Sequence, residues 1–218
     1  MFVFSFFFIH TSADGLQVFL IDDSTSMREH WDDVILLLDI LAYIVKKNDK
    51  NGIDLFFTMS DTVCTNEKKT TELVELAKKQ RPRKVKEGTE HLSNIYHRLG
   101  SILGKYQRRL EEEDQRKPRN AQSRPWHADD PKDVRELNLY IFTDGIWQPE
   151  SDAVPPIKSL GETLDRFKKP NIQVGVQFIQ FGNDEVGSAR LSFLDNGLIS
   201  TGLTRYDHTP KPLYGASR

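Results

Sequence analysis

The stretch LQVFLIDDSTSM, residues 16–27, joins an apolar run to a cluster of carboxyl and hydroxyl side chains. Its first part, Leu16–Ile21, is short, apolar and β-prone, which is typical of a strand covered on both faces of a sheet. After the cluster, apolar residues recur at helical spacing over Trp31–Lys47. The stretch therefore predicts a strand, then a turn that carries polar groups, then a helix.

The same alternation of buried strands and amphipathic helices continues along the chain. It predicts an α/β fold that is doubly wound around a mostly parallel central sheet, with helices on both faces. In such open sheets, ligands bind beyond the carboxyl ends of the strands. The further predicted strands are Ile53–Met59, Leu137–Thr143 and Ile172–Phe181, and the further predicted helices are Glu72–Lys79, Leu92–Leu110, Pro156–Lys169 and Asp184–Leu194.

Composition divides the chain into one domain, residues 16–207, and three other segments. Residues 1–15 form an apolar extension that opens with MFVFSFFFI, and they fit an edge strand, a poorly ordered start or a signal peptide. Residues 111–136 are almost all charged or polar, which predicts a solvated, flexible insertion. Residues 208–218 form a tail whose two prolines prevent a full helix.

Overall composition excludes several functional classes. The chain has 218 residues, with 30 Lys and Arg against 32 Asp and Glu, so its net charge of −2 favours neither nucleic acid nor an anionic membrane as a partner. The single cysteine, Cys64, excludes an internal disulfide and a thiolate zinc cluster. No apolar run reaches the roughly 20 residues that cross a bilayer. These features favour a cytoplasmic location, while the apolar start leaves secretion as an alternative.

Oxygen-bearing side chains gather at three places in the sequence, two of them directly after a predicted strand and one just before a predicted helix. Asp22, Ser24 and Ser26 follow the first strand, Thr89 precedes the long central helix, and Asp144 follows the strand Leu137–Thr143. All of these donors are hard oxygens, which select Mg²⁺, Mn²⁺ or Ca²⁺ over zinc or copper. The small, tight set favours Mg²⁺ most.

These motifs resemble the von Willebrand factor type A (vWA) domain, and FIQFGND, residues 178–184, is similar to fungal members of that family. The resemblance covers residues 16–207, and its strongest matches are VFLIDDSTSM (18–27) and LYIFTDG (139–145). It implies a Rossmann-like fold and a metal-ion-dependent adhesion site (MIDAS) formed by Asp22, Ser24, Ser26, Thr89 and Asp144. It also implies a final helix that closes the sheet, and because the tail of residues 208–218 cannot form a full helix, we expect that helix to be missing. In that family the serines bind the cation, the carboxylates support it mainly through water, and a Glu or Asp of a protein partner completes its coordination. The resemblance thus implies a protein-binding module and not an enzyme.

Simpler interpretations exist for several of these residues. Ser26 with Glu29 spells a capping box for the first helix, Thr89 fits a cap of the next long helix, and Asp144 fits a plain turn with Gly145. Asp23 is expected to be a solvent-facing spacer. We expect Trp31 and Trp147 to pack half-buried, with a place on a partner-facing rim as the alternative. The six histidines show no ligand spacing.

Two other functions remain as alternatives at this point. A Mg²⁺-dependent phosphohydrolase would also place an Asp after its first strand, but Asp22 and Asp23 are adjacent where that chemistry needs Asp-x-Asp. A vWA scaffold without metal, which binds by shape, is the other alternative. It arises because Thr25 stands where most family members have glycine between the two serines.

Overall fold

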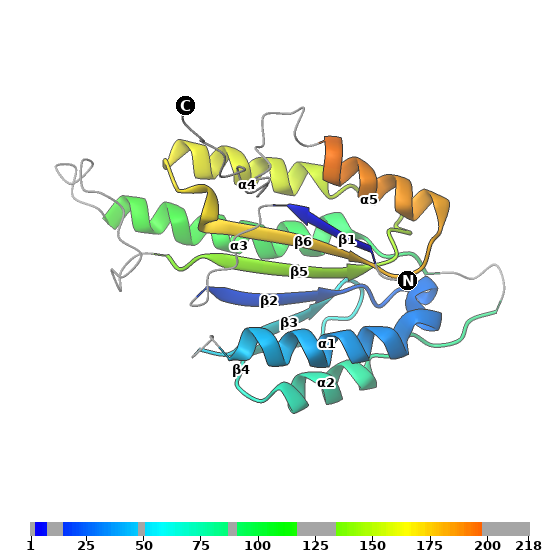
Figure 1. Ribbon diagram of the computed structural model, residues 1–218. Helices are drawn as coiled ribbons and strands as arrows, with labels where there is room; N and C mark the ends of the chain where they lie inside the picture. Colours follow the sequence, from blue (N-terminus) through cyan, green and yellow to red (C-terminus); the bar gives the residue numbers. More distant parts are fainter. Residues whose placement is uncertain (1–2, 8–14, 48–50, 87–90, 117–133, 198–218) are drawn as a thin grey trace, which may run out of the picture.

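The computed structural model (Figure 1) describes residues 3–7, 15–47, 51–86, 91–116 and 134–197. Within these residues the chain folds around a six-stranded sheet in the order β1-β6-β5-β2-β3-β4. The four middle strands are parallel, and the two edge strands, β1 and β4, run antiparallel to their neighbours. The strands are β1 (Val3–Phe7), β2 (Leu16–Ile21), β3 (Ile53–Phe57), β4 (Val63–Glu67), β5 (Leu137–Thr143) and β6 (Val174–Gln180).

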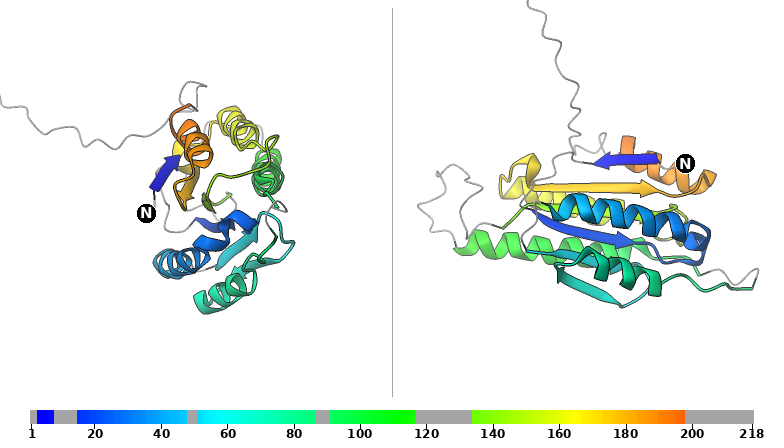
Figure 2. Two further views of the ribbon diagram at one scale, coloured as in Figure 1. Left: turned by 90° about the vertical axis from the view of Figure 1, so that its right-hand side faces the viewer. Right: turned by 60° about the horizontal axis from the view of Figure 1, so that its bottom comes forward.

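Helices cover both faces of this sheet, which confirms the predicted doubly wound α/β fold. The end-on view in Figure 2 shows helices on either side of the sheet. On the first face lie α1 (Trp31–Lys46), preceded by the 3₁₀ helix η1 (Thr25–His30), and α2 (Thr70–Lys79). On the second face lie α3 (Ile95–Arg116), α4 (Val154–Arg166) and α5 (Glu185–Gly197), and a 3₁₀ turn, η3 (Asn171–Gln173), leads into β6.

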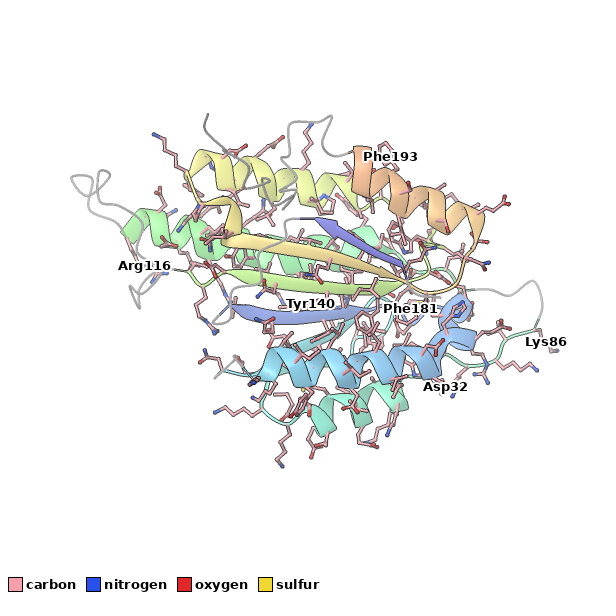
Figure 3. All side chains as sticks on the ribbon, viewed as in Figure 1. Asp32, Lys86, Arg116, Tyr140, Phe181 and Phe193 are labelled. Atoms are coloured by element: carbon pink, nitrogen blue, oxygen red, sulfur yellow. The ribbon has the colours of Figure 1, made fainter. Side chains whose placement is uncertain are left out.

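The sheet separates two apolar cores. On the α1 side, the rings of Phe19 and Tyr140 stack with their centroids 4.9 Å apart. The ring centroids of Phe142 and Phe181 are 5.5 Å apart. Figure 3 labels Tyr140 and Phe181 on this face. Every residue of β5 is buried, as the continuous apolar run of a central parallel strand predicts. None of the described helices has the length and apolar character needed to cross a membrane.

The structure corrects the predicted start of the charged insertion. Helix α3 runs to Arg116 and so contains the first six residues of the segment 111–136. Its Glu113 is buried, because the carboxylate pairs with Nζ of Lys169 at 2.7 and 2.8 Å and accepts a hydrogen bond from the Val134 amide. A buried charge needs such partners, and here they come from segments distant in the sequence. Residues 117–133 lie outside the described part of the chain.

The predicted edge strand at the start of the chain is present in the structure. Residues 3–7 of the apolar extension form β1, the edge strand that was one of its three interpretations. Residues 198–218 lie outside the described part of the chain, and with them the tail and the expected absence of a closing helix. The second edge strand, β4, was not predicted, because its sequence VCTNE has no apolar alternation and its residues are exposed or half-buried.

Candidate functional site

Three segments far apart in the sequence meet at the carboxyl ends of the parallel strands. The turn after β2 is bound to β5, because the Asp22 amide donates to the Phe142 carbonyl at 2.8 Å. The residues just before α3 lie between this turn and the loop after β5, where Ser93 forms a parallel bridge with Trp147. Figure 1 shows these strand ends together on one side of the sheet. The topology therefore gathers the segments that carry the candidate metal ligands.

The Asp22 carboxylate is the centre of this arrangement. It is completely buried and accepts four hydrogen bonds. Oδ1 accepts from the Ser24 amide and the Thr58 hydroxyl, both at 3.1 Å. Oδ2 accepts from the hydroxyls of Ser93 at 3.0 Å and Thr143 at 2.9 Å. Asp22 thus joins the ends of β2, β3 and β5 to the segment before α3.

Burial makes the negative charge of Asp22 costly. Desolvation, followed by repulsion from Asp144, raises the pKa of Asp22 from 3.8 to about 6, although its hydrogen bonds with Ser24 and Thr143 oppose the shift. At ~1.4 kcal/mol per pH unit, ionised Asp22 destabilises the fold by ~3 kcal/mol at neutral pH. Because the folded-state pKa lies above the unfolded one, this cost develops as pH rises from about 4 to about 6 and persists above that range.

The hydroxyls of Ser24 and Ser26 face each other, with their Oγ atoms 3.0 Å apart. Ser24 is buried and stands immediately before η1. The capping box predicted for Ser26 and Glu29 is wrong, because Ser26 lies inside η1 and no side chain caps η1 or α1. The Ser26 hydroxyl forms a hydrogen bond with the Ser24 hydroxyl and does not cap a helix.

Asp144 stands in a tight turn after β5. Its Oδ1 accepts a hydrogen bond from the Ile146 amide at 2.9 Å, and Gly145 adopts a φ of +81°, so the predicted turn exists. Its Oδ2 is buried and has no hydrogen-bond partner among the residues that the structure describes. Burial raises the pKa of Asp144, and the charge of Asp184 raises it further. The nearby Ser26 hydroxyl lowers this pKa, although it does not form a hydrogen bond with Asp144 Oδ2.

The described chain resumes at His91, which is bound to the serine turn. Thr89 itself lies outside the described residues. Two residues later, His91 is bound to Thr25: its amide donates to the Thr25 hydroxyl at 3.1 Å, and its carbonyl accepts from the Thr25 amide at 3.3 Å. Thr25 therefore ties the backbone at His91 to the serine turn.

Asp23 is not the solvent-facing spacer that was predicted. Its carboxylate accepts hydrogen bonds from the amides of Met59 at 2.7 Å and Ser60 at 3.0 Å. The Thr58 hydroxyl shares its single proton between Oδ1 of Asp22 and Oδ1 of Asp23, which lies 3.2 Å away. Partial burial is the main reason that its pKa is raised. Asp23 binds the turn after β2 to the loop after β3, while the adjacent Asp22 points inward.

Both tryptophans near the site are buried, so the alternative that they form a partner-facing rim is wrong. The Trp147 indole donates to the Thr143 hydroxyl at 2.9 Å, and that oxygen also accepts from the Gly145 amide at 3.0 Å. With both lone pairs used, the Thr143 hydroxyl has only its proton to offer Asp22. Arg190 of α5 lies over the Trp147 ring and donates to the carbonyls of Trp147 and Gly145.

Helix α5 packs directly on the Asp144 turn. A Cβ atom on Gly187 would lie 2.0 Å from the Asp144 carbonyl oxygen, and one on Gly145 would lie 2.7 Å from the Gly187 Cα. Only glycine at both positions permits this approach. The position of Asp144 therefore depends on α5.

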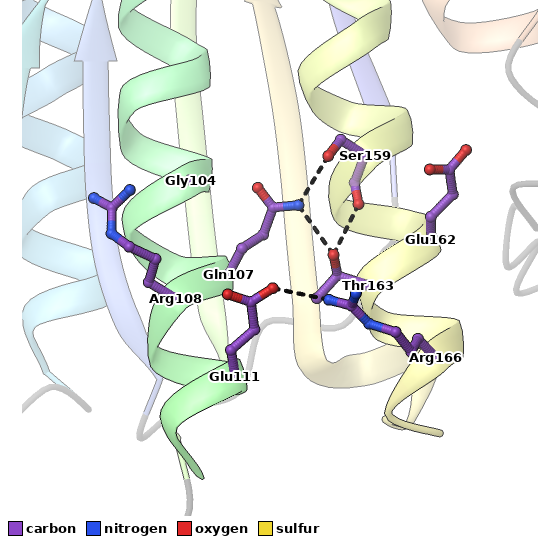
Figure 4. Close-up of a pocket in the computed structure, with 8 residues that line it drawn as sticks. All are labelled: Gly104, Gln107, Arg108, Glu111, Ser159, Glu162, Thr163 and Arg166. Atoms are coloured by element: carbon purple, nitrogen blue, oxygen red, sulfur yellow. Dashed lines mark hydrogen bonds and ion pairs between the residues drawn. The ribbon is translucent and has the colours of Figure 1, made fainter. Parts of the chain in front are cut away.

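The described residues offer no second candidate site as well placed as the strand ends. They contain no group of three or more His, Cys, Asp or Glu side chains that could hold a metal. A shallow groove of about 490 Å³ lies between α3 and α4 (Figure 4). It is bridged by Gln107, which donates to the hydroxyls of Ser159 and Thr163, and by the ion pair of Arg166 with Glu111. The groove is lined by helix residues and not by the strand ends.

Comparison with known proteins does not identify the chain: no protein-family model matches it, and no curated protein matches it. The arrangement of Asp22, Ser24, Ser26 and Asp144 at the strand ends is therefore the basis for assigning a function.

Proposed function

We propose that this chain is a vWA-type protein-interaction domain in which Asp22, Ser24, Ser26, Thr89 and Asp144 hold a divalent cation, with Mg²⁺ favoured over Mn²⁺ and Ca²⁺. A Glu or Asp carboxylate of a protein partner completes the coordination. The observation that carries the proposal is the buried Asp144 Oδ2, which has no hydrogen-bond partner among the described residues, on a carboxyl group that is near enough to the Ser26 hydroxyl for its pKa to be affected. The Ser26 hydroxyl is in turn paired with that of Ser24.

The spacing of the serine hydroxyls supports this role. Neighbouring ligands in an octahedral Mg²⁺ site, each about 2.1 Å from the ion, lie about 3.0 Å apart. The Oγ atoms of Ser24 and Ser26 are separated by 3.0 Å. The two hydroxyls therefore fit adjacent coordination positions with no change in their separation.

The charge balance also supports a cation. Asp22 and Asp144 are both buried, and each is close enough to another carboxylate for repulsion to raise its pKa. Within the described residues, neither forms an ion pair with lysine or arginine. Buried carboxylates of this kind require compensation, and a divalent cation supplies it. Asp144 Oδ2 is available to accept a hydrogen bond from water on the cation.

Neutral ligands explain why such a site would bind and not react. Serine and threonine hydroxyls leave most of the positive charge on the cation, which then attracts a carboxylate from outside. A charge-assisted contact of this kind, shielded from water, can dominate an interface. The cation supplies the attraction, and the turn after β2 with the tether from Thr25 to His91 positions its ligands.

The hydrogen bonds of Asp22 favour binding over phosphoryl transfer. A nucleophilic aspartate needs an accessible oxygen, whereas both oxygens of Asp22 each accept two hydrogen bonds in a fully buried position. Asp22 is better suited to anchoring the turn that carries Ser24 and to balancing the charge of the cation than to attacking a phosphorus atom.

The proposal is tested by calorimetric titration of the chelator-treated protein with Mg²⁺ and Mn²⁺. We expect saturable 1:1 binding that raises the melting temperature. Ser26→Ala and Asp144→Asn should weaken binding at least tenfold. The matched control is Asp165→Asn, because Asp165 is exposed in the last turn of α4, which leads through η3 into the amino end of β6 and not toward the carboxyl ends of the strands.

A second measurement tests the open coordination position. Water relaxation by bound Mn²⁺ should fall when acetate is added, because the carboxylate displaces water from the ion. Absence of any metal binding would favour the scaffold that binds by shape. Release of phosphate from an aryl phosphate by wild type, lost in Asp22→Asn, would favour the phosphohydrolase.

A further inference from the structure

Helix α1 carries an exposed apolar stripe on the side turned away from the sheet. Leu36, Ile40, Tyr43 and Ile44 are 57, 47, 73 and 54% exposed. Their spacing of three and four residues places them on one helix face. The opposite face is the buried one, formed by Val34, Leu38 and Ala42 and packed in the core. Scattered exposed apolar residues are ordinary, but a contiguous stripe of four marks an interaction surface.

Charges of opposite sign flank this stripe. Asp33 precedes Ile40 by seven residues, and Lys47 follows it by seven. Both side chains belong to exposed residues, and neither takes part in an ion pair within the described residues. Seven residues are two helical turns, so each charge lies about 10 Å along the helix axis from Ile40.

This pattern is self-complementary when the helix is reversed. If two copies of α1 lie antiparallel with a two-fold axis at Ile40, Leu36 of one faces Ile44 of the other. Asp33 then faces Lys47 at both ends of the contact. A parallel pair would instead place like charges together. A two-fold contact uses the same surface on both subunits, so its pattern must be complementary to itself in this way.

We propose that two copies of this chain associate through the exposed face of α1, antiparallel and about a two-fold axis at Ile40. The contact does not depend on the proposed metal function, because none of its residues belongs to that site. A single helix face lies at the lower end of stable interface sizes, so we expect a dissociation constant in the micromolar range. Electrostatic pairing at the ends would set the antiparallel direction.

Sedimentation velocity of the full chain over about 1–200 μM tests the dimer. Wild type should shift from monomer to dimer across this range, and Ile40→Glu should raise the dissociation constant at least tenfold. Phe193→Glu is the matched control, because Phe193 of α5 is also an exposed apolar residue, at 60% against 47% for Ile40, and α5 lies on the other face of the sheet. Unchanged circular dichroism and melting temperature would show that Ile40→Glu still folds.

A charge exchange tests the antiparallel geometry. Asp33→Lys and Lys47→Asp should each weaken association, and the double exchange should restore it. In a Cys64→Ser background, Ile40→Cys should form a disulfide-linked dimer on mild oxidation, because the axis brings the two copies of position 40 together. A monomer throughout the concentration range would overturn the proposal. So would a dimer that is insensitive to Ile40→Glu, or a double exchange no better than the single ones.

Discussion

Replacing Gly187 by alanine should displace the Asp144 turn and with it the candidate metal site. The new Cβ would lie 2.0 Å from the Asp144 carbonyl oxygen, where an ordinary contact begins at 3.4 Å, so α5 and the turn must separate by about 1.4 Å. The atom it meets is backbone and cannot rotate away. Overpacking of this kind costs ~1–3 kcal/mol or more, and ligands must be held within about 0.5 Å for a site to work.

The assay combines chemical denaturation with Mn²⁺ titration. Gly187→Ala should lower the unfolding free energy by at least ~2 kcal/mol and weaken Mn²⁺ binding at least tenfold. Gly104→Ala is the control, because its Cβ would come no closer than 4.0 Å to a neighbour, and alanine in a helix is preferred to glycine by up to ~1 kcal/mol. A Gly187→Ala protein with wild-type stability and metal affinity would refute the argument that α5 positions Asp144.

Three further predictions follow from individual contacts. Because the pKa of Asp22 is raised to about 6, protons should compete with the metal below that pH. Calorimetry should show the Mg²⁺ affinity falling as the pH decreases from 7 to 5. An affinity that does not change with pH would contradict the assignment of Asp22 to the metal site. Lys169→Met removes the ammonium group that pairs with the buried Glu113 carboxylate and should destabilise the fold by ~3–5 kcal/mol in urea denaturation, with substantial recovery when Glu113→Gln is added. Thr25→Gly removes the hydroxyl that binds the His91 amide and should weaken Mn²⁺ binding severalfold; unchanged affinity would show that this tether does not position a ligand.

The sequence was sufficient to predict the central strands but not the edges. Strands β2, β3, β5 and β6 are apolar runs, because a parallel strand in the middle of the sheet is buried on both faces. The edge strand β4 lacks that signal, since its pairing with β3 is made by backbone groups and only weakly by side chains. The end of α3 was mistaken for solvated chain because its buried Glu113 depends on Lys169, 56 residues later.

At the candidate site, too, local sequence predicted some residues, whereas those that act through contacts with distant segments were missed. Asp22, Ser24 and Ser26 form one short motif, and Asp144 follows a clear strand, so local sequence was enough to select them. Ser93 and Thr143 were missed as partners of Asp22, and a hydroxyl residue at the end of a buried strand is the one signal that could have indicated Thr143. The contrast between Asp22 and Asp23 is invisible locally, because two adjacent carboxylates differ only in which way the tertiary structure turns them.

Anomalous diffraction from crystals grown with Mn²⁺ tests the central claim most directly. The account predicts a single manganese peak about 2.0–2.6 Å from the hydroxyl oxygens of Ser24 and Ser26, with the Thr89 hydroxyl and Asp144 Oδ2 turned toward the ion or its waters. A map with no manganese at the strand ends, and with the Thr89 hydroxyl remote from the serine pair, would contradict it.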